Sequence, residues 1–70
     1  MDPNANLAEQ ARLVDATERE DIMRRKELRE ALQNWLDHGG FVPTWKAYPA
    51  ASKAFRAWQR NRIRFQDLYR

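Results

Sequence analysis

The chain has 70 residues, which leaves room for a single domain over residues 1–70, and it has no cysteine to reinforce a small core. Three tryptophans, three phenylalanines and two tyrosines are the expected reinforcement, because each aromatic side chain buries a large apolar area. A third of the residues are charged, no apolar run approaches the roughly 18–20 residues of a membrane span, and the first residues form no secretory leader. These features favour a cytoplasmic protein.

The first half of the chain is predicted to be helical. Asn6-Leu7-Ala8-Glu9 has the spacing of a capping box, and Asp2-Pro3 offers a second possible start. No glycine or proline follows before Gly39, and one long helix from Asn6 to Asp37 is the favoured prediction. The alternative is a break near Thr17–Asp21, where charged residues interrupt the apolar face. An unbroken helix would be roughly 48 Å long, longer than a domain of this size is wide.

The second half begins with a turn. Gly39 is well placed to end a helix in the left-handed conformation, and Val42-Pro43 prevents the helix from resuming. Thr44–Tyr48 is predicted to be a turn or short helical piece, and Pro49 opens a last helix to about Leu68.

The fold class predicted from these elements is all-α: a long N-terminal helix, a Gly-Gly turn, a short aromatic connector, and a C-terminal helix packed back antiparallel as a helical hairpin or small bundle. On the last helix one apolar face carries Ala51, Ala54, Trp58, Phe65, Leu68 and Tyr69, with Phe55 at its edge. The core is expected to centre on Leu28, Leu32, Trp35, Leu36, Phe41, Trp58 and Phe65. A smaller stripe, Leu7, Ala11 and Val14, packs within the monomer or docks on a partner or second copy.

Charge is unevenly divided along the chain. Residues 1–38 hold nine acidic and six basic residues, a net charge of −3, whereas residues 39–70 hold one acidic and seven basic residues, a net charge of +6. In the last helix the cations recur at helical spacing on one side, as Lys53, Arg56, Arg60 and Arg64. This basic row is either a solvated face paired with acids of the first helix, or a contact surface for a polyanion or acidic partner.

The roles of Trp45 and Tyr48 are harder to assign than those of the other aromatic residues, because both lie on the connector outside the helical faces. They are either part of the core or, if exposed, an interaction site. His38 and Ser52 are each the only residue of their type, and neither has the neighbours that a catalytic or metal site requires. No enzyme activity, cofactor, metal or small-molecule substrate is therefore predicted.

The opening Met1-Asp2-Pro3-Asn4-Ala5-Asn6-Leu7 and the segment Ala31-Leu32-x-x-Trp35-Leu36-Asp37-x-Gly39-Gly40-Phe41-x-Pro43 resemble a group of small bacterial and phage proteins. That group shares an Asp-Pro-Asn start and a Trp-Leu-x-x-Gly-Gly-Phe turn. The resemblance covers about a third of the chain, implies a phage or mobile-element origin, and transfers no site residues.

Two functions are expected from the sequence. The first is a non-catalytic protein-interaction module, such as a phage or mobile-element modulator of a host or viral protein. It would use Trp45, Tyr48 and the basic row as its contact surface, or self-associate. The second is a nucleic-acid-binding protein without sequence preference, acting through Lys53, Arg56, Arg60 and Arg64.

Overall fold

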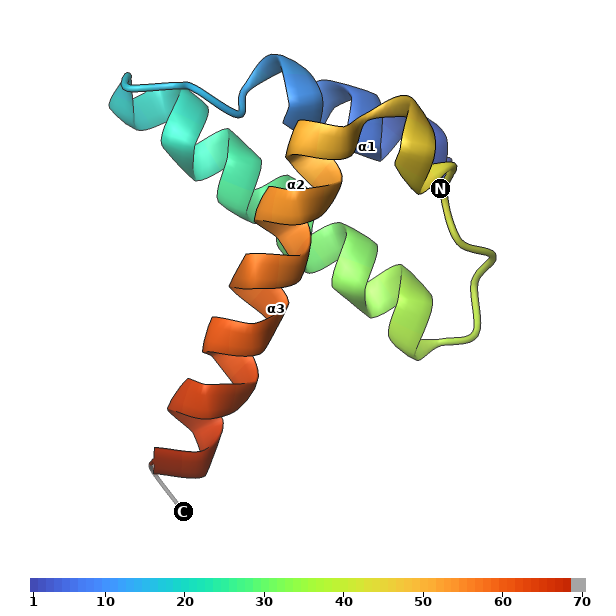
Figure 1. Cartoon of the computed structure of the whole chain (residues 1–70), viewed down its shortest axis with the longest axis vertical. Helices are drawn as coiled ribbons and strands as arrows, with labels where there is room; N and C mark the ends of the chain where they lie inside the picture. The colour runs from blue at the N-terminus through green and yellow to red at the C-terminus, as the bar shows by residue number, and fades with distance from the viewer. Residues whose placement is uncertain (69–70) are drawn as a thin grey trace.

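The computed structural model describes the backbone of residues 1–68 and the side chains of residues 1–62. Three α-helices and one short 3-10 helix follow one another along the chain: α1 (Pro3–Arg12), α2 (Arg19–Asp37), η1 (Trp45–Ala47) and α3 (Pro49–Leu68). The prediction of an all-α fold is confirmed over these residues, among which no strand occurs (Figure 1).

The first helix begins at the earlier of the two predicted starts. The Asp2 side chain accepts hydrogen bonds from the backbone N–H groups of Asn4 and Ala5, at 2.9 and 3.3 Å, and Pro3 occupies the first helical position. Asp2 thus supplies an acceptor for backbone N–H groups that the start of a helix leaves unpaired. Pro3 has no N–H and so leaves none unpaired at the first helical position. Asn6 is therefore not the residue that caps the helix, and its side chain is buried.

The prediction of one long helix from Asn6 to Asp37 is wrong. Helix α1 ends at Arg12 and α2 begins at Arg19, so the break starts a few residues before the alternative position considered from the sequence. An unbroken helix of about 48 Å would also exceed the longest dimension of the molecule, which is 35 Å.

The break is stabilised by a contact across the two helices. The Arg25 side chain, from α2, donates hydrogen bonds to the backbone carbonyls of Leu13 and Val14, at 3.2 and 2.9 Å. The Leu13 carbonyl also accepts from the Ala16 N–H at 3.0 Å, and Arg25 supplies a donor from α2 to both carbonyls just beyond the end of α1. Val14, Asp15 and Thr17 in the connecting segment are also weak helix formers, which lowers the cost of leaving the helix.

Helices α1 and α2 lie antiparallel. Asn6 contacts Leu28, and one turn further along α1 Glu9 contacts Arg24, so positions rise on one helix as they fall on the other. The main buried residues of the fold are Leu7, Leu13, Leu28, Leu32, Ala51 and Phe55. Leu7 is completely buried, which assigns the N-terminal apolar stripe at this position to packing within the monomer.

Helix α3 was expected to lie antiparallel on the end of the first long helix, and this part of the prediction is wrong. Its first turns pack on α1, and Figure 1 shows it crossing α2 and continuing away from the other helices. A hydrogen bond of 2.6 Å from Gln59 to Gln33 joins α3 to α2 at the crossing. The loop before η1 is tied to α1 by a hydrogen bond of 2.7 Å from the Thr44 N–H to the Asn4 side chain.

The turn after α2 places Phe41 outside the core, which corrects the sequence prediction. Gly39 has a φ of 81°, and Gly40 lies against the Trp35 ring so closely that a Cβ there would collide with it. The Trp35 indole N–H donates to the Phe41 carbonyl at 2.9 Å, and the two rings meet edge to face. Because the Trp35 ring fills the space over Gly40, Phe41 is left 62% exposed.

Among the other predicted core residues, Leu28 and Leu32 are buried as expected. Trp35, Leu36 and Trp58 are half-buried. The Phe65 side chain and residue Tyr69 lie outside the described residues. The residue with the largest fully buried side chain is Phe55, which the sequence placed only at the edge of an apolar face.

Candidate functional site

Most of the predicted contact residues meet around one depression at the junction of η1 and α3. Trp45, Lys53, Arg56 and Arg60 line an open hollow of about 450 Å³, together with Lys46, Pro49 and Ser52. We call this feature the basic hollow. Lys46 was not among the residues singled out from the sequence, because its place beside α3 depends on how the connector folds.

The junction that forms the hollow is held by Ser52 in the first turns of α3. Its hydroxyl lies 2.8 Å from the carbonyl oxygen of Trp45 and 2.8 Å from that of Tyr48. Pro49 begins α3 immediately after the connector, which fixes the backbone direction at this point. The buried Ser52 therefore has a structural role, and it sets the position of Trp45 relative to the cations of α3.

Trp45 lies between the core and the basic row. Its ring stacks on Phe55 with 5.7 Å between centroids, and the Arg56 guanidinium carbon is 5.3 Å from its centroid. Phe55 is fully buried whereas Arg56 is exposed, so the three side chains form a column that leads from the interior to the surface. The cation–π contact restrains the Arg56 guanidinium at the edge of the hollow.

A second pair of the same kind extends the aromatic cluster on its other side. Phe55 contacts Trp58 with 5.6 Å between ring centroids, and the Arg62 guanidinium carbon lies 5.5 Å from the Trp58 centroid. Trp58 does not line the basic hollow, which makes it a natural comparison for Trp45.

Among residues 1–62, no acidic side chain forms an ion pair with Lys53, Arg56 or Arg60. The side chains of Lys53, Arg56 and Arg60 are exposed, and the ion pairs found among residues 1–62 all lie within α1 and α2. No acidic residue occurs between Asp37 and Asp67, so none is available from neighbouring positions in the sequence. The expected pairing of these three cations with acids of the first helix is therefore absent from the described part of the chain. The Arg64 side chain lies outside it.

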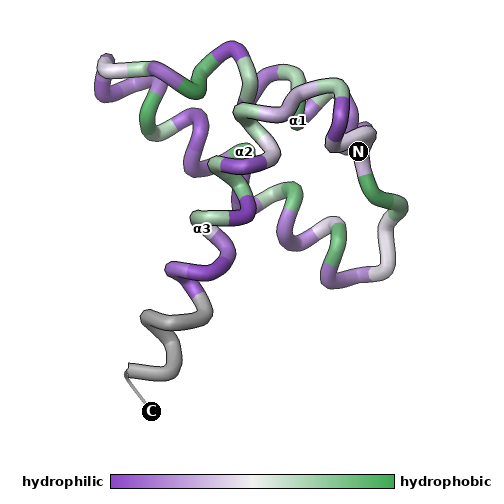
Figure 2. Tube along the Cα trace, in the orientation of Figure 1, coloured by the Kyte–Doolittle hydropathy of each residue, from purple (hydrophilic) through white to green (hydrophobic). Residues whose placement is uncertain are grey.

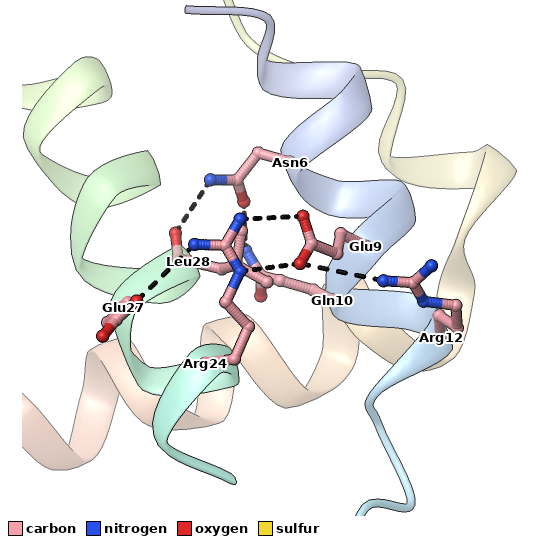
Figure 3. Close-up of polar contacts among 7 residues, drawn as sticks. All are labelled: Asn6, Glu9, Gln10, Arg12, Arg24, Glu27 and Leu28. Atoms are coloured by element: carbon pink, nitrogen blue, oxygen red, sulfur yellow. Dashed lines mark hydrogen bonds and ion pairs between the residues drawn. The ribbon is translucent and has the colours of Figure 1, made fainter. Parts of the chain in front are cut away.

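Two acids of the N-terminal half, Glu9 and Glu27, form ion pairs with Arg24, and the Glu9 pair joins α1 to α2 (Figure 3). Glu9 receives two hydrogen bonds from Arg24, at 2.7 and 3.0 Å, and Glu27 lies 3.5 Å from the same guanidinium. The hydrogen bond from Arg24 holds the pKa of the Glu9 carboxyl below its ordinary value, and Glu9 in turn raises the pKa of Arg24. These pairs engage two of the nine acidic residues of this half, and among residues 1–62 none of them involves a cation of the basic row.

Beside this ion pair lies a buried polar link that sequence reasoning missed. The Asn6 side-chain amide donates to the Leu28 carbonyl at 3.0 Å and accepts from the Gln10 amide at 2.7 Å (Figure 3). Asn6 and Gln10 are one helical turn apart, and both are almost fully buried. Their spacing was visible in the sequence, but nothing in it indicated that this polar face points inward.

The remaining predicted positions lie apart from the basic hollow. Tyr48 is half-buried and contributes a backbone carbonyl to the Ser52 contact rather than lining the hollow. His38 ends α2, where a ring nitrogen lies 2.7 Å from the Asn34 carbonyl. Phe41 and Val42 are each 62% exposed, and they form the hydrophobic stretch that Figure 2 shows in the loop after α2.

The described residues contain neither a candidate metal site nor a candidate membrane span. No three acidic or histidine side chains among them are grouped so that they could hold a metal ion. None of the described helices has the length and apolar character needed to cross a membrane.

The chain matches no protein-family model, and comparison with curated proteins and with solved structures returns no significant match. The function of the protein is therefore argued from the chemistry of its surface.

Proposed function

We propose that the protein is a non-catalytic nucleic-acid-binding module that contacts the phosphate backbone through the basic hollow. The observation that carries the proposal is the convergence of four cations, Lys46, Lys53, Arg56 and Arg60, on one open hollow with no carboxylate in its lining. Two separate segments, η1 and α3, contribute to it.

Physical chemistry favours a phosphate partner for such a surface. Unpaired cations close together repel one another, and when they neutralise phosphates they release the counterions condensed on the nucleic-acid backbone. Arginine also offers paired N–H donors that match phosphate oxygens. The sequence contains no helix-turn-helix, zinc-finger or RNP pattern, so binding without sequence preference is the expected mode.

The half of the chain that contains the hollow supplies the long-range attraction. Residues 39–70 carry a net charge of +6, whereas residues 1–38 carry −3. Among residues 1–62 no ion pair joins the two halves, so this asymmetry is maintained on the folded surface. A polyanion is therefore oriented toward the α3 side of the molecule.

A second candidate, a protein-interaction module, is favoured by a different surface. Phe41 and Val42 are large apolar side chains, each 62% exposed and adjacent in one loop. Such residues are frequent in protein interfaces. In this proposal the contact is made by the loop rather than by Trp45 and Tyr48, and a phage modulator of a host or viral protein belongs to the same class. Loss of partner capture on Phe41→Ser with Val42→Ser would support it.

The nucleic-acid proposal is tested by replacing Lys53, Arg56 and Arg60 together with glutamine. The matched control replaces three exposed cations of α1 and α2, Arg12, Arg19 and Lys26, with glutamine, and so removes the same charge. Fluorescence anisotropy of labelled oligonucleotides at physiological salt reports binding. The α3 variant is expected to lose binding, and the control is expected to retain most of it.

Equal losses in the two variants would mean that only net charge matters, and the basic hollow would not be the site. Absence of binding by the unmodified protein, even at low salt, would remove the nucleic-acid proposal and leave the protein-interaction candidate. Circular dichroism of both variants checks that the helices are retained.

A further inference from the structure

We propose that the basic hollow binds one nucleotide unit of a single-stranded nucleic acid, with the base stacked on the Arg56 guanidinium and the flanking phosphates at Lys53 and Arg60. This inference rests on the proposed function and specifies its ligand. It follows from three features of the hollow: its shape, its aromatic column and the spacing of its cations.

The shape of the site suits a single strand. Its cations line a shallow, open hollow to which two elements contribute, with Lys46 on η1 and the others on α3. The volume of about 450 Å³ falls in the range of roughly 300–1,000 Å³ typical of small-ligand sites. A stiff duplex keeps its bases stacked inside and presents its backbone from outside, whereas a single strand can bend and place one nucleotide in a hollow.

The aromatic column explains why a tryptophan lies in an otherwise cationic lining. Phe55, Trp45 and Arg56 are layered from the buried interior to the exposed surface, with 5.7 Å between the first two rings and 5.3 Å from Trp45 to the Arg56 guanidinium carbon. Bases of single strands stack on aromatic rings and on arginine planes. A base on Arg56 would extend this column by one layer. A site for phosphate alone would require no aromatic support.

The cations on either side of Arg56 are placed for the flanking phosphates. Lys53 precedes it by about one helical turn and Arg60 follows it by about one turn, so the two lie roughly 10 Å apart along the helix axis. Both are exposed. The same nucleotide chemistry occurs in free nucleotides, but the cations continue along α3 beyond the position of a single base, which favours a strand.

The experiment compares three labelled probes of equal length: a thymidine decanucleotide, the same backbone with abasic residues, and a duplex. We expect the single strand to bind about five- to hundredfold more tightly than the abasic probe, the range for one stacked base. Trp45→Leu should lower the ratio of the affinities for the single-stranded and abasic probes toward one, because Arg56 then loses its aromatic support. Trp58→Leu, which removes the other tryptophan on Phe55, should leave the difference between probes intact.

If Trp45→Leu loses helicity, Trp45→Phe is measured in its place. Because it keeps an aromatic ring under Arg56, this variant should keep most of the preference for the thymidine probe over the abasic probe. Equal affinity for the thymidine and abasic probes, or tighter binding of the duplex, would overturn this inference. The proposed function would still stand if the Lys53, Arg56 and Arg60 variant lost binding to all probes. Displacement of the strand by thymidine 5′-monophosphate at concentrations similar to those of unlabelled decanucleotide would assign the site to free nucleotides and overturn the single-strand inference.

Discussion

The buried link between α1 and α2 allows a sharp test of the fold through the substitution Asn6→Asp. The Asn6 amide donates to the Leu28 carbonyl and accepts from Gln10. A carboxylate keeps the acceptor but replaces the donor, so two oxygen atoms would face each other at the position of the present 3.0 Å hydrogen bond. Loss of the hydrogen bond costs about 0.5–1.5 kcal/mol, and a buried unpaired charge raises the total to about 3–5 kcal/mol.

This loss is large against the expected stability, since 70 residues at roughly 0.05–0.15 kcal/mol each give about 4–10 kcal/mol. It should also depend on pH. The folded state favours the protonated acid, which can donate to Leu28, so the pKa of the new carboxyl is raised on folding. The destabilisation is therefore small below the unfolded pKa of about 3.9 and grows as pH rises from there through the folded pKa.

The assay is urea denaturation of the original and substituted chains at pH 3.5 and pH 7, followed by circular dichroism. We expect the difference in unfolding free energy between the two chains to be several times larger at pH 7. A difference below about 0.5 kcal/mol at pH 7, within the range of ordinary surface substitutions, would refute the buried link between the helices.

Three other predictions concern stability. Phe55→Ala should cost about 3–5 kcal/mol and lower the thermal midpoint sharply, because a fully buried ring between two tryptophans is removed; an unchanged midpoint would contradict its central position. Gly39→Ala should cost about 1–2 kcal/mol in urea denaturation, since a φ of 81° is unfavourable for residues with a Cβ; no measurable cost would show a different turn. Because Arg24 lowers the pKa of Glu9 on folding, the stability from this pair is present above the ordinary Glu9 pKa near 4.5 and is lost as pH falls through the folded value. Arg24→Gln should weaken that acid dependence, and NMR titration of Glu9 should then give a higher pKa.

Local signals were sufficient for part of the fold. Gly39 and Pro49 mark the end of α2 and the start of α3 because backbone geometry restricts them directly. The spacing of Lys53, Arg56 and Arg60 places them on one side of any helix, whatever it packs against. The cationic part of the candidate site could therefore be predicted.

The position of the break between α1 and α2 could not be predicted, because it depends on residues far apart in the sequence. No glycine or proline marks it, and its exposed carbonyls are satisfied by Arg25 from the other helix. Once the chain turns there, Asn6 faces Leu28 and becomes a buried link instead of a helix cap. Local spacing carries no information on such a pairing.

The aromatic core was misjudged for a related reason. The expected partner of α3 was the end of the first helix, which would bury Phe41 and leave Phe55 at an edge. Instead η1 folds onto α3, so Trp45 covers Phe55, while Trp35 closes over Gly40 and leaves Phe41 exposed. The same packing of the connector on α3 places Lys46 in the lining of the basic hollow.

The salt dependence of single-strand binding tests the central claim most directly. With Lys46, Lys53 and Arg60 neutralising phosphates and Arg56 stacking on the base, the slope of log Kobs against log salt concentration should be about −2, and it should fall to about −0.7 when Lys53, Arg56 and Arg60 are replaced with glutamine. The control variant on α1 and α2 should keep the original slope. A slope near zero for the unmodified protein, or an unchanged slope in the α3 variant, would contradict binding through the basic hollow.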